Sequence, residues 1–180
     1  MSLKDVFIVH GRDHKPVKEF QSMLKEFGIN SIILHEQASG SRTIVEKLEK
    51  YSDVRFAFVI LTPDDVGYNQ VEAESVVRYN KKHPKLKDLR IYVKEGFSGE
   101  IIDNMVEFLK FIKERARQNT ILEFGYFAGM LGRDRVCCLY QGDIELPSDM
   151  QGILYIPFKK SIMECRNSII TELKSAGYSI

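Results

Sequence analysis

The feature that most constrains the fold is an alternation of short apolar runs with segments of helical periodicity in the first third of the chain. The apolar runs are Val6–Val9, Ser31–Leu34 and Val54–Leu61. Between them, hydrophobic residues recur every three or four positions from Val17 to Phe27 and again from Ile44 to Leu48. Strands that alternate with helices in this way are joined by crossover connections. They therefore lie parallel in one sheet that helices cover.

The same alternation returns after residue 115. A helix around Glu123 is followed by a strand at Arg135–Tyr140, a strand at Ile153–Ile156 and a closing helix that ends before Gly177. Short connections and right-handed crossovers favour an α/β, flavodoxin-like, doubly wound sheet of five parallel strands. We expect the order 2-1-3-4-5, with helices on both faces.

The segment at about 68–114 interrupts this pattern. Hydrophobic residues from Ile101 to Ile112 recur at helical spacing, and the stretch from Arg78 to Glu95 is strongly basic. We predict a mostly helical insertion in a single domain that spans residues 1–180. The basic stretch is either a solvated surface or a face that binds an anion or a partner.

Composition excludes several classes of protein. A chain of 180 residues with 44% hydrophobic residues can bury a sizeable core. Its net charge of only +1 argues against a protein that mainly binds nucleic acid. Three cysteines, two of them adjacent in a strand-like run, form neither a disulfide framework nor a zinc motif. With neither a membrane-length apolar run nor a signal peptide, we expect a cytoplasmic protein with no membrane partner.

Glu123 is the only charged residue between Gln118 and Gly132. A carboxylate on an apolar helix is costly to bury alone, so it either pairs with a cation or faces a cavity that holds a ligand. Arg12, Arg42 and Arg117 are the candidates for a structural ion pair. The residues alone leave both interpretations open.

Two polar loops are expected at the carboxyl ends of the first and third strands, where the strand order reverses and ligands bind in such sheets. In the first loop, His10 could form a hydrogen-bonding wall, Gly11 permits close backbone approach and Arg12 could contact a phosphate. In the second, one of Asp64 and Asp65 is expected to cap a turn, and the other could accept ribose hydroxyl groups.

Helical spacing places three further residues near the face of Glu123. Asn119 could bind ribose hydroxyl groups, and Tyr126 and Phe127 could stack on a flat base or belong to the core. The four histidines show no metal-ligand spacing, so we predict no metal site.

Several blocks in order resemble bacterial TIR-like nucleotide-binding domains, including the TIR domains fused to STING-type receptors in anti-phage defence. The blocks are Val6–Asp13, Ile33–Gln37, Thr43–Lys47, Phe56–Asp65, Arg115–Gly125, Gly132–Val136 and Pro147–Gly152. The resemblance covers nearly the whole chain outside the insertion.

The resemblance implies an NAD⁺ nucleosidase that cleaves the nicotinamide–ribose N-glycosidic bond with a helix-borne glutamate, which falls on Glu123. NAD⁺ or a related nucleotide is then the substrate, and neither a metal nor a cofactor is needed. The resemblance further implies anti-phage or stress signalling, activation by self-association, or activation by a separately encoded sensor protein.

Two other functions stay open at this stage. TIR-like folds also serve as nonenzymatic modules that bind a nucleotide or another TIR domain, and the fold alone does not choose between these uses. A more distant resemblance is to nucleoside deoxyribosyltransferases, which also carry a glutamate in a similar helix and cleave an N-glycosidic bond.

Overall fold

The computed structural model describes residues 5–37, 43–51, 53–69, 71, 109–150 and 152–180. The chain divides into two compact units, one formed by residues 1–65 and 115–180 and the other by residues 66–114. The first unit carries the main sheet and its helices. The sequence predicts a mostly helical insertion at about 68–114. Most of that segment, residues 72–108, lies outside the described residues.

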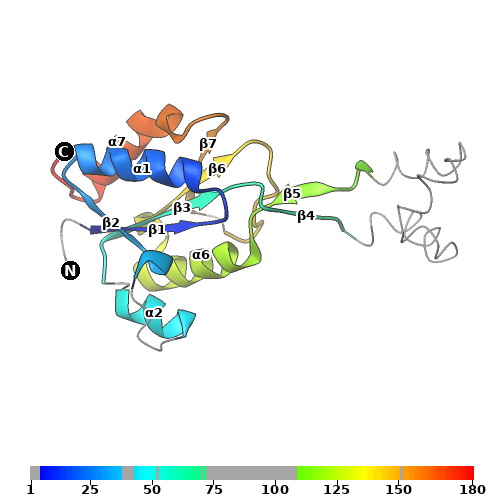
Figure 1. Cartoon of the computed structure of the whole chain (residues 1–180), viewed down its shortest axis with the longest axis horizontal. Coiled ribbons are helices and arrows are strands. Elements are labelled where there is room, and N and C mark those ends of the chain that lie inside the picture. Colours follow the sequence, from blue (N-terminus) through cyan, green and yellow to red (C-terminus); the bar gives the residue numbers. More distant parts are fainter. Residues whose placement is uncertain (1–4, 38–42, 52, 70, 72–108, 151) are drawn as a thin grey trace, which may run out of the picture. The chain divides into compact units, whose positions relative to one another are not determined.

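The first unit is built on a five-stranded parallel sheet (Figure 1). Its strands are β1 (Asp5–His10), β2 (Asn30–Ile33), β3 (Phe56–Leu61), β6 (Val136–Gln141) and β7 (Leu154–Phe158). They lie in the order β2-β1-β3-β6-β7, and each neighbouring pair is parallel. Counted within this sheet alone, the order is 2-1-3-4-5, which confirms the predicted flavodoxin-like fold.

Helices cover both faces of the sheet. In Figure 1, α1 (His14–Glu26) and α7 (Arg166–Ser175) lie on one face, and α2 (Ile44–Tyr51) and α6 (Gln118–Leu131) lie on the other. Among the described residues, short 3₁₀ turns complete the connections: η1 (Leu34–Glu36), η3 (Arg133–Arg135) and η4 (Ile162–Cys165). The sheet is therefore buried on both sides, as parallel sheets require.

The central strand β3 shows how one segment serves two cores. All six of its residues, Phe56 to Leu61, are buried. Phe56, Phe58 and Ile60 join the core under α1 and α7, whereas Ala57, Val59 and Leu61 join the core under α6. Alternate side chains of a strand point to opposite faces, so a continuous apolar run is what a doubly covered strand needs.

Helix α1 begins at His14, two residues before Pro16. Asp13 is its N-cap, and the Asp13 carboxylate accepts a hydrogen bond of 2.9 Å from the Lys15 amide. Pro16 therefore lies inside the first turn, where its missing amide hydrogen leaves no intrahelical bond unmade.

Helix α2 buries a different face from the one its apolar residues indicate. Ile44 and Val45 are 53% and 52% exposed, whereas Lys47 and Leu48 are 7% and 2% exposed. The Lys47 ammonium group donates a hydrogen bond of 2.8 Å to the carbonyl oxygen of Gln37. The hydrogen bond satisfies the buried ammonium group, and the aliphatic part of the lysine side chain packs like an apolar residue. A lysine can therefore occupy the inner face of α2.

The second unit contains parts of two short strands that the sequence did not indicate. They are β4 (Asp65–Gly67) and β5 (Lys113–Arg115), which pair in a two-stranded sheet. Searched over the described residues, the chain has no helix long and apolar enough to cross a membrane.

Two hydrophobic residues of α6 give a matched test of this packing. Phe127 is fully buried and its ring lies 4.3 Å from that of Phe7, whereas Leu122 is 64% exposed. We expect Phe127→Ala to lower the free energy of unfolding by about 3–5 kcal/mol because it leaves a cavity. Leu122→Ala is expected to change it by less than about 0.5 kcal/mol. Equal losses in denaturant titrations would contradict the assigned helix face.

Candidate active site

Helix α6 is held against the carboxyl end of β1. Its buried stripe consists of Thr120, Phe124, Phe127 and Leu131, which recur at helical spacing. The Thr120 side chain is 1% exposed, and its hydroxyl group donates a hydrogen bond of 3.2 Å to the carbonyl oxygen of His10. The bond places the first turns of α6 beside the end of the strand.

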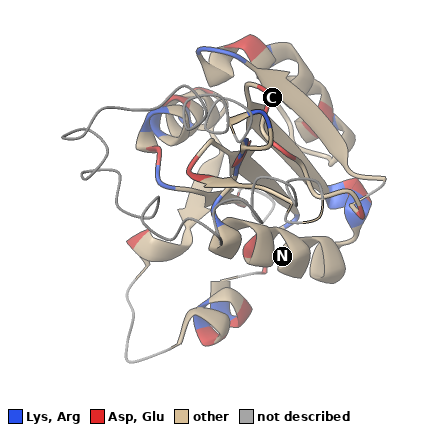
Figure 2. Cartoon of the chain, turned by 90° about the vertical axis from the view of Figure 1, so that its right-hand side faces the viewer, with Lys and Arg blue, Asp and Glu red and all other residues tan. Residues whose placement is uncertain are grey.

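Glu123 lies one turn beyond Thr120 and beside the buried stripe. Glu123 is the only charged residue of α6, and the rest of that helix is drawn in the colour of uncharged residues in Figure 2. Within the described part of the chain, the Glu123 carboxylate makes no hydrogen bond, and no cation lies within 4.0 Å of it. Arg117 interacts with it only through the longer-range Coulomb attraction. Of the three arginines proposed as ion-pair partners, Arg12 and Arg117 do not pair with Glu123, and Arg42 lies outside the described residues.

Burial perturbs the acidity of this carboxyl group. It raises the pKa of Glu123 from its ordinary value to about 6, and attraction to Arg117 opposes the shift. At neutral pH the group is still mostly ionised. A carboxylate with a pKa near the working pH, held next to a cavity without a bonded partner, is typical of a functional site.

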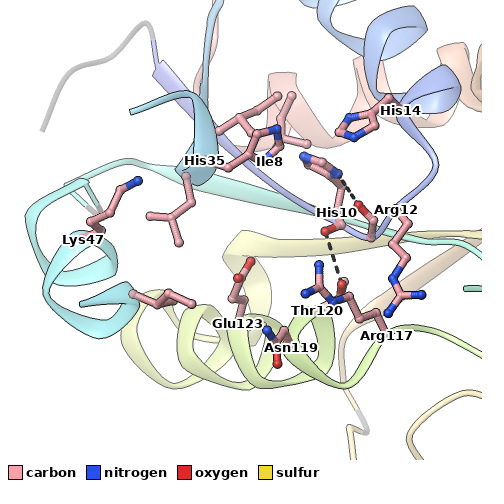
Figure 3. A pocket seen from close by; sticks show the side chains of 14 residues that line it. Ile8, His10, Arg12, His14, His35, Lys47, Arg117, Asn119, Thr120 and Glu123 are labelled. Atoms are coloured by element: carbon pink, nitrogen blue, oxygen red, sulfur yellow. Dashed lines mark hydrogen bonds between the residues drawn. The ribbon is translucent and has the colours of Figure 1, made fainter. Parts of the chain in front are cut away.

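Glu123 opens into a cavity of about 370 Å³. The volume lies toward the lower end of the range of about 300–1,000 Å³ that is common for small-molecule sites. The cavity is lined from β1 and the following loop, the first residue of α1, β2 and η1, α2, and the start of α6. Figure 3 shows its side chains, which belong to Ile8, His10, Gly11, Arg12, His14, Ile33, Leu34, His35, Ile44, Lys47, Arg117, Asn119, Thr120 and Glu123.

The loop after β1 is fixed by the loop after β3. The Asp64 carboxylate accepts hydrogen bonds of 3.1 Å from both the Arg12 amide and the Thr62 hydroxyl group. It lies so close to Gly11 that a Cβ atom there would be 2.7 Å from the Asp64 Cγ atom. Gly11 is therefore required by this close approach.

Three cations border the cavity around the single carboxylate. Arg12 lies 4.0 Å from Asp65 with 64% of its side chain exposed, and Arg117 is also exposed. Lys47 is buried in the wall with its ammonium group bonded to Gln37. Together they make the surroundings of the cavity favourable for an anionic ligand. Sequence reasoning missed Lys47 because it lies among exposed apolar residues.

Three histidines meet at the wall opposite α6 (Figure 3). His10 ends β1, His14 begins α1, and His35 lies in η1. The ring centroids are separated by 5.2 Å for His10 and His14, 4.7 Å for His10 and His35, and 5.6 Å for His14 and His35. Burial lowers the pKa of His10, although its hydrogen bond to the Gly11 carbonyl opposes the shift. Sequence reasoning missed that three residues separate His10 from His14, which is a spacing found among metal ligands, and only the fold brings His35 to them.

The structure brings most of the predicted site residues together. His10, Gly11, Arg12, Asn119 and Glu123 all line the cavity.

Four other predicted site residues do not line it. The Asp64 carboxylate accepts a hydrogen bond from the Arg12 amide and so holds the Gly11–Arg12 loop in place. The Asp65 carboxylate lies 4.0 Å from the Arg12 guanidinium group. Tyr126 is half-buried against the core, and Phe127 lies fully within it. Their rings are therefore not placed to stack on a ligand in this cavity.

The sequence of the chain is similar to those of several known proteins. The model of the family described as CAP12/Pycsar effector protein, TIR domain, matches residues 5–81 and 91–160. The chain is 35% identical over 175 residues to the protein YuaY of Escherichia coli K12, covering 97% of this chain and 46% of YuaY. It thus spans about half the length of that relative.

Two further relatives carry the family in their names. The chain is 29% identical over 171 residues to the protein tirC of Dictyostelium discoideum, covering 91% of this chain and 69% of tirC. A shorter match of 47% identity over 45 residues links it to the Pycsar effector protein XpPycTIR of Xanthomonas perforans, covering 24% of this chain and 15% of that protein.

The raised pKa of Glu123 predicts a pH-dependent cost to stability. Because ionisation is harder in the folded than in the unfolded protein, the cost is absent below about pH 4.5, grows as pH rises to about 6, and is constant above it. Discounted for partial solvent screening, it amounts to about 1 kcal/mol. Glu123→Gln should therefore be about 1 kcal/mol more stable than the parent at about pH 8, or roughly 2–4 °C in Tm.

The same pair of proteins at about pH 4 is the control, because the parent glutamate is then largely protonated and the two Tm values should converge. Thermal unfolding at the two pH values measures the difference. A glutamine variant that is less stable than the parent at about pH 8 would show that Glu123 makes a stabilising bond.

Proposed function

The chain belongs to the family of CAP12/Pycsar effector TIR domains, and on that premise we propose that it cleaves the nicotinamide–ribose bond of NAD⁺ with Glu123 as the catalytic residue. The observation that carries the proposal is the Glu123 carboxylate itself. It faces the cavity with no bonded partner among the described residues, and its pKa is raised to about 6. Membership of the family also supports a role in anti-phage signalling, which we include in the proposal.

A single carboxylate suits this reaction. In ordinary glycoside hydrolysis the leaving oxygen must be protonated, so a second carboxyl group acts as the acid. The nicotinamide ring of NAD⁺ is already cationic. It leaves with the electron pair of the C1′–N bond and becomes neutral, so no proton donor is needed.

Bond cleavage leaves positive charge on the ribose. The ionised Glu123 stabilises this oxocarbenium-like sugar in a partly desolvated cavity, where a fixed charge acts more strongly than in water. Water then adds to C1′ and releases one proton, which gives ADP-ribose. Attack by the adenine ring in place of water would give the cyclic product.

The rest of the cavity suits a dinucleotide. Arg12, Lys47 and Arg117 provide positive charge for the diphosphate, and the Asn119 amide lies one helical turn from Glu123, where ribose hydroxyl groups would bind. Gly11 leaves the backbone open to close approach. Self-association and a separate sensor protein belong to the proposal as the means of activation.

Release of nicotinamide from NAD⁺ is the direct test, measured with the parent over a range of protein concentrations. We expect Glu123→Gln to reduce the rate by at least about 100-fold, because the charge that stabilises the transition state is lost. Glu172→Gln is the matched control. It removes a half-buried carboxylate on α7 that does not line the cavity, and it should keep the parental rate.

Two outcomes would count against the proposal. Equal nicotinamide release by the parent and Glu123→Gln would exclude Glu123 as the catalytic residue. Saturable NAD⁺ binding without release at any protein concentration would favour the nonenzymatic nucleotide-binding module. A total rate of nicotinamide release that rises more steeply than linearly with protein concentration is the result expected if assembly activates the domain.

A further inference from the structure

We propose that His10, His14 and His35 form a binding site for a divalent transition-metal ion of the zinc class. The potential ligand atoms of the three imidazoles all lie within 4.8 Å of one another. The residues come from three different elements, so the fold, not a local sequence motif, creates the cluster. This site lies beyond the proposed NAD⁺ chemistry, which needs no metal.

The hydrogen bond of His10 leaves one nitrogen ready to act as a ligand. Its Nδ1 atom lies 2.7 Å from the carbonyl oxygen of Gly11. A carbonyl oxygen only accepts, so Nδ1 carries the hydrogen and the neutral ring has its lone pair on Nε2. Metal-binding histidines are commonly oriented in this way by a carbonyl group behind the ring.

The Nε2 atom of His10 is a buried acceptor that lacks a hydrogen-bond partner among the described residues. A buried polar atom without a partner costs free energy, and a bound cation would satisfy it. His14 and His35 are exposed, so their rings can rotate to bring their nitrogens from within 4.8 Å to the shorter separation that zinc ligands adopt.

The ligand set indicates the class of metal. Three imidazoles suit zinc, cobalt, nickel or copper, whereas magnesium and calcium select oxygen ligands. Three protein ligands leave a coordination position free, as in open zinc sites. Here that position would face the cavity that Glu123 also lines, so water or an anionic group of a ligand would fill it.

Cobalt binding tests the site without any measurement of NAD⁺ turnover. The full chain, stripped of metal with a chelator, is titrated with Co²⁺, and the visible absorption of the ion is followed. We expect one ion per chain, with the intense absorption of a four- or five-coordinate site, and displacement of that ion by Zn²⁺.

Single variants locate the ligands. His14→Ala and His35→Ala alter exposed residues, so the fold should survive, as circular dichroism will check. Each should weaken Co²⁺ binding by more than the roughly 10- to 100-fold loss caused by removal of an outer-shell partner. His83→Ala removes the remaining histidine and should bind Co²⁺ as the parent does.

Three results would overturn the site. These are no saturable Co²⁺ absorption, the weak spectrum of a six-coordinate hydrated ion, and parental affinity in folded His14→Ala and His35→Ala. These experiments measure only metal binding. A negative result would therefore overturn the metal site without bearing on the proposed NAD⁺ reaction, which is tested by nicotinamide release.

Discussion

The position of α6 on the sheet is the constraint on which the candidate site depends. Three features fix it: the buried ring of Phe124, the packing of Phe127 on Phe7, and the hydrogen bond from the Thr120 hydroxyl to the His10 carbonyl. With the helix held in this register, Glu123 lines the cavity beside the end of β1. The cavity exists because the loops after β1 and β2 meet this face of the helix.

The electrostatics of the cavity follow from that placement. A carboxylate beside a buried stripe loses much of its hydration, and the resulting rise in pKa is a cost that the folded protein bears. A stabilising salt bridge would remove the cost, but it would also occupy the carboxylate. Keeping Arg117 at longer range leaves Glu123 charged and accessible, which is the condition that the proposed chemistry needs.

Much of this arrangement can be predicted from the sequence. The apolar runs predict the parallel sheet and its order. The carboxyl end of β1 places His10, Gly11 and Arg12 at the cavity, whereas Asp64 and Asp65, which follow β3, do not line it. Glu123 is conspicuous because its neighbours are uncharged. Local patterns fail where tertiary contacts decide. Lys47 is buried because the Gln37 carbonyl oxygen accepts a hydrogen bond from its ammonium group, and Phe127 lies in the core because its ring packs on that of Phe7. The histidine cluster joins three separate elements, and although His10 and His14 are close in the sequence, no local pattern reveals that His35 lies beside them.

The most direct test of the account is a titration of the Glu123 side-chain carboxyl group by carbon NMR, with and without a noncleavable NAD⁺ analogue. We expect a pKa of about 6 for Glu123 in the free protein. The bound analogue should lower this value, because a cationic nicotinamide ring next to the carboxylate favours the ionised form. A pKa near the ordinary 4.5 that the analogue leaves unchanged would contradict the claim that Glu123 is an unpaired carboxylate in the substrate pocket.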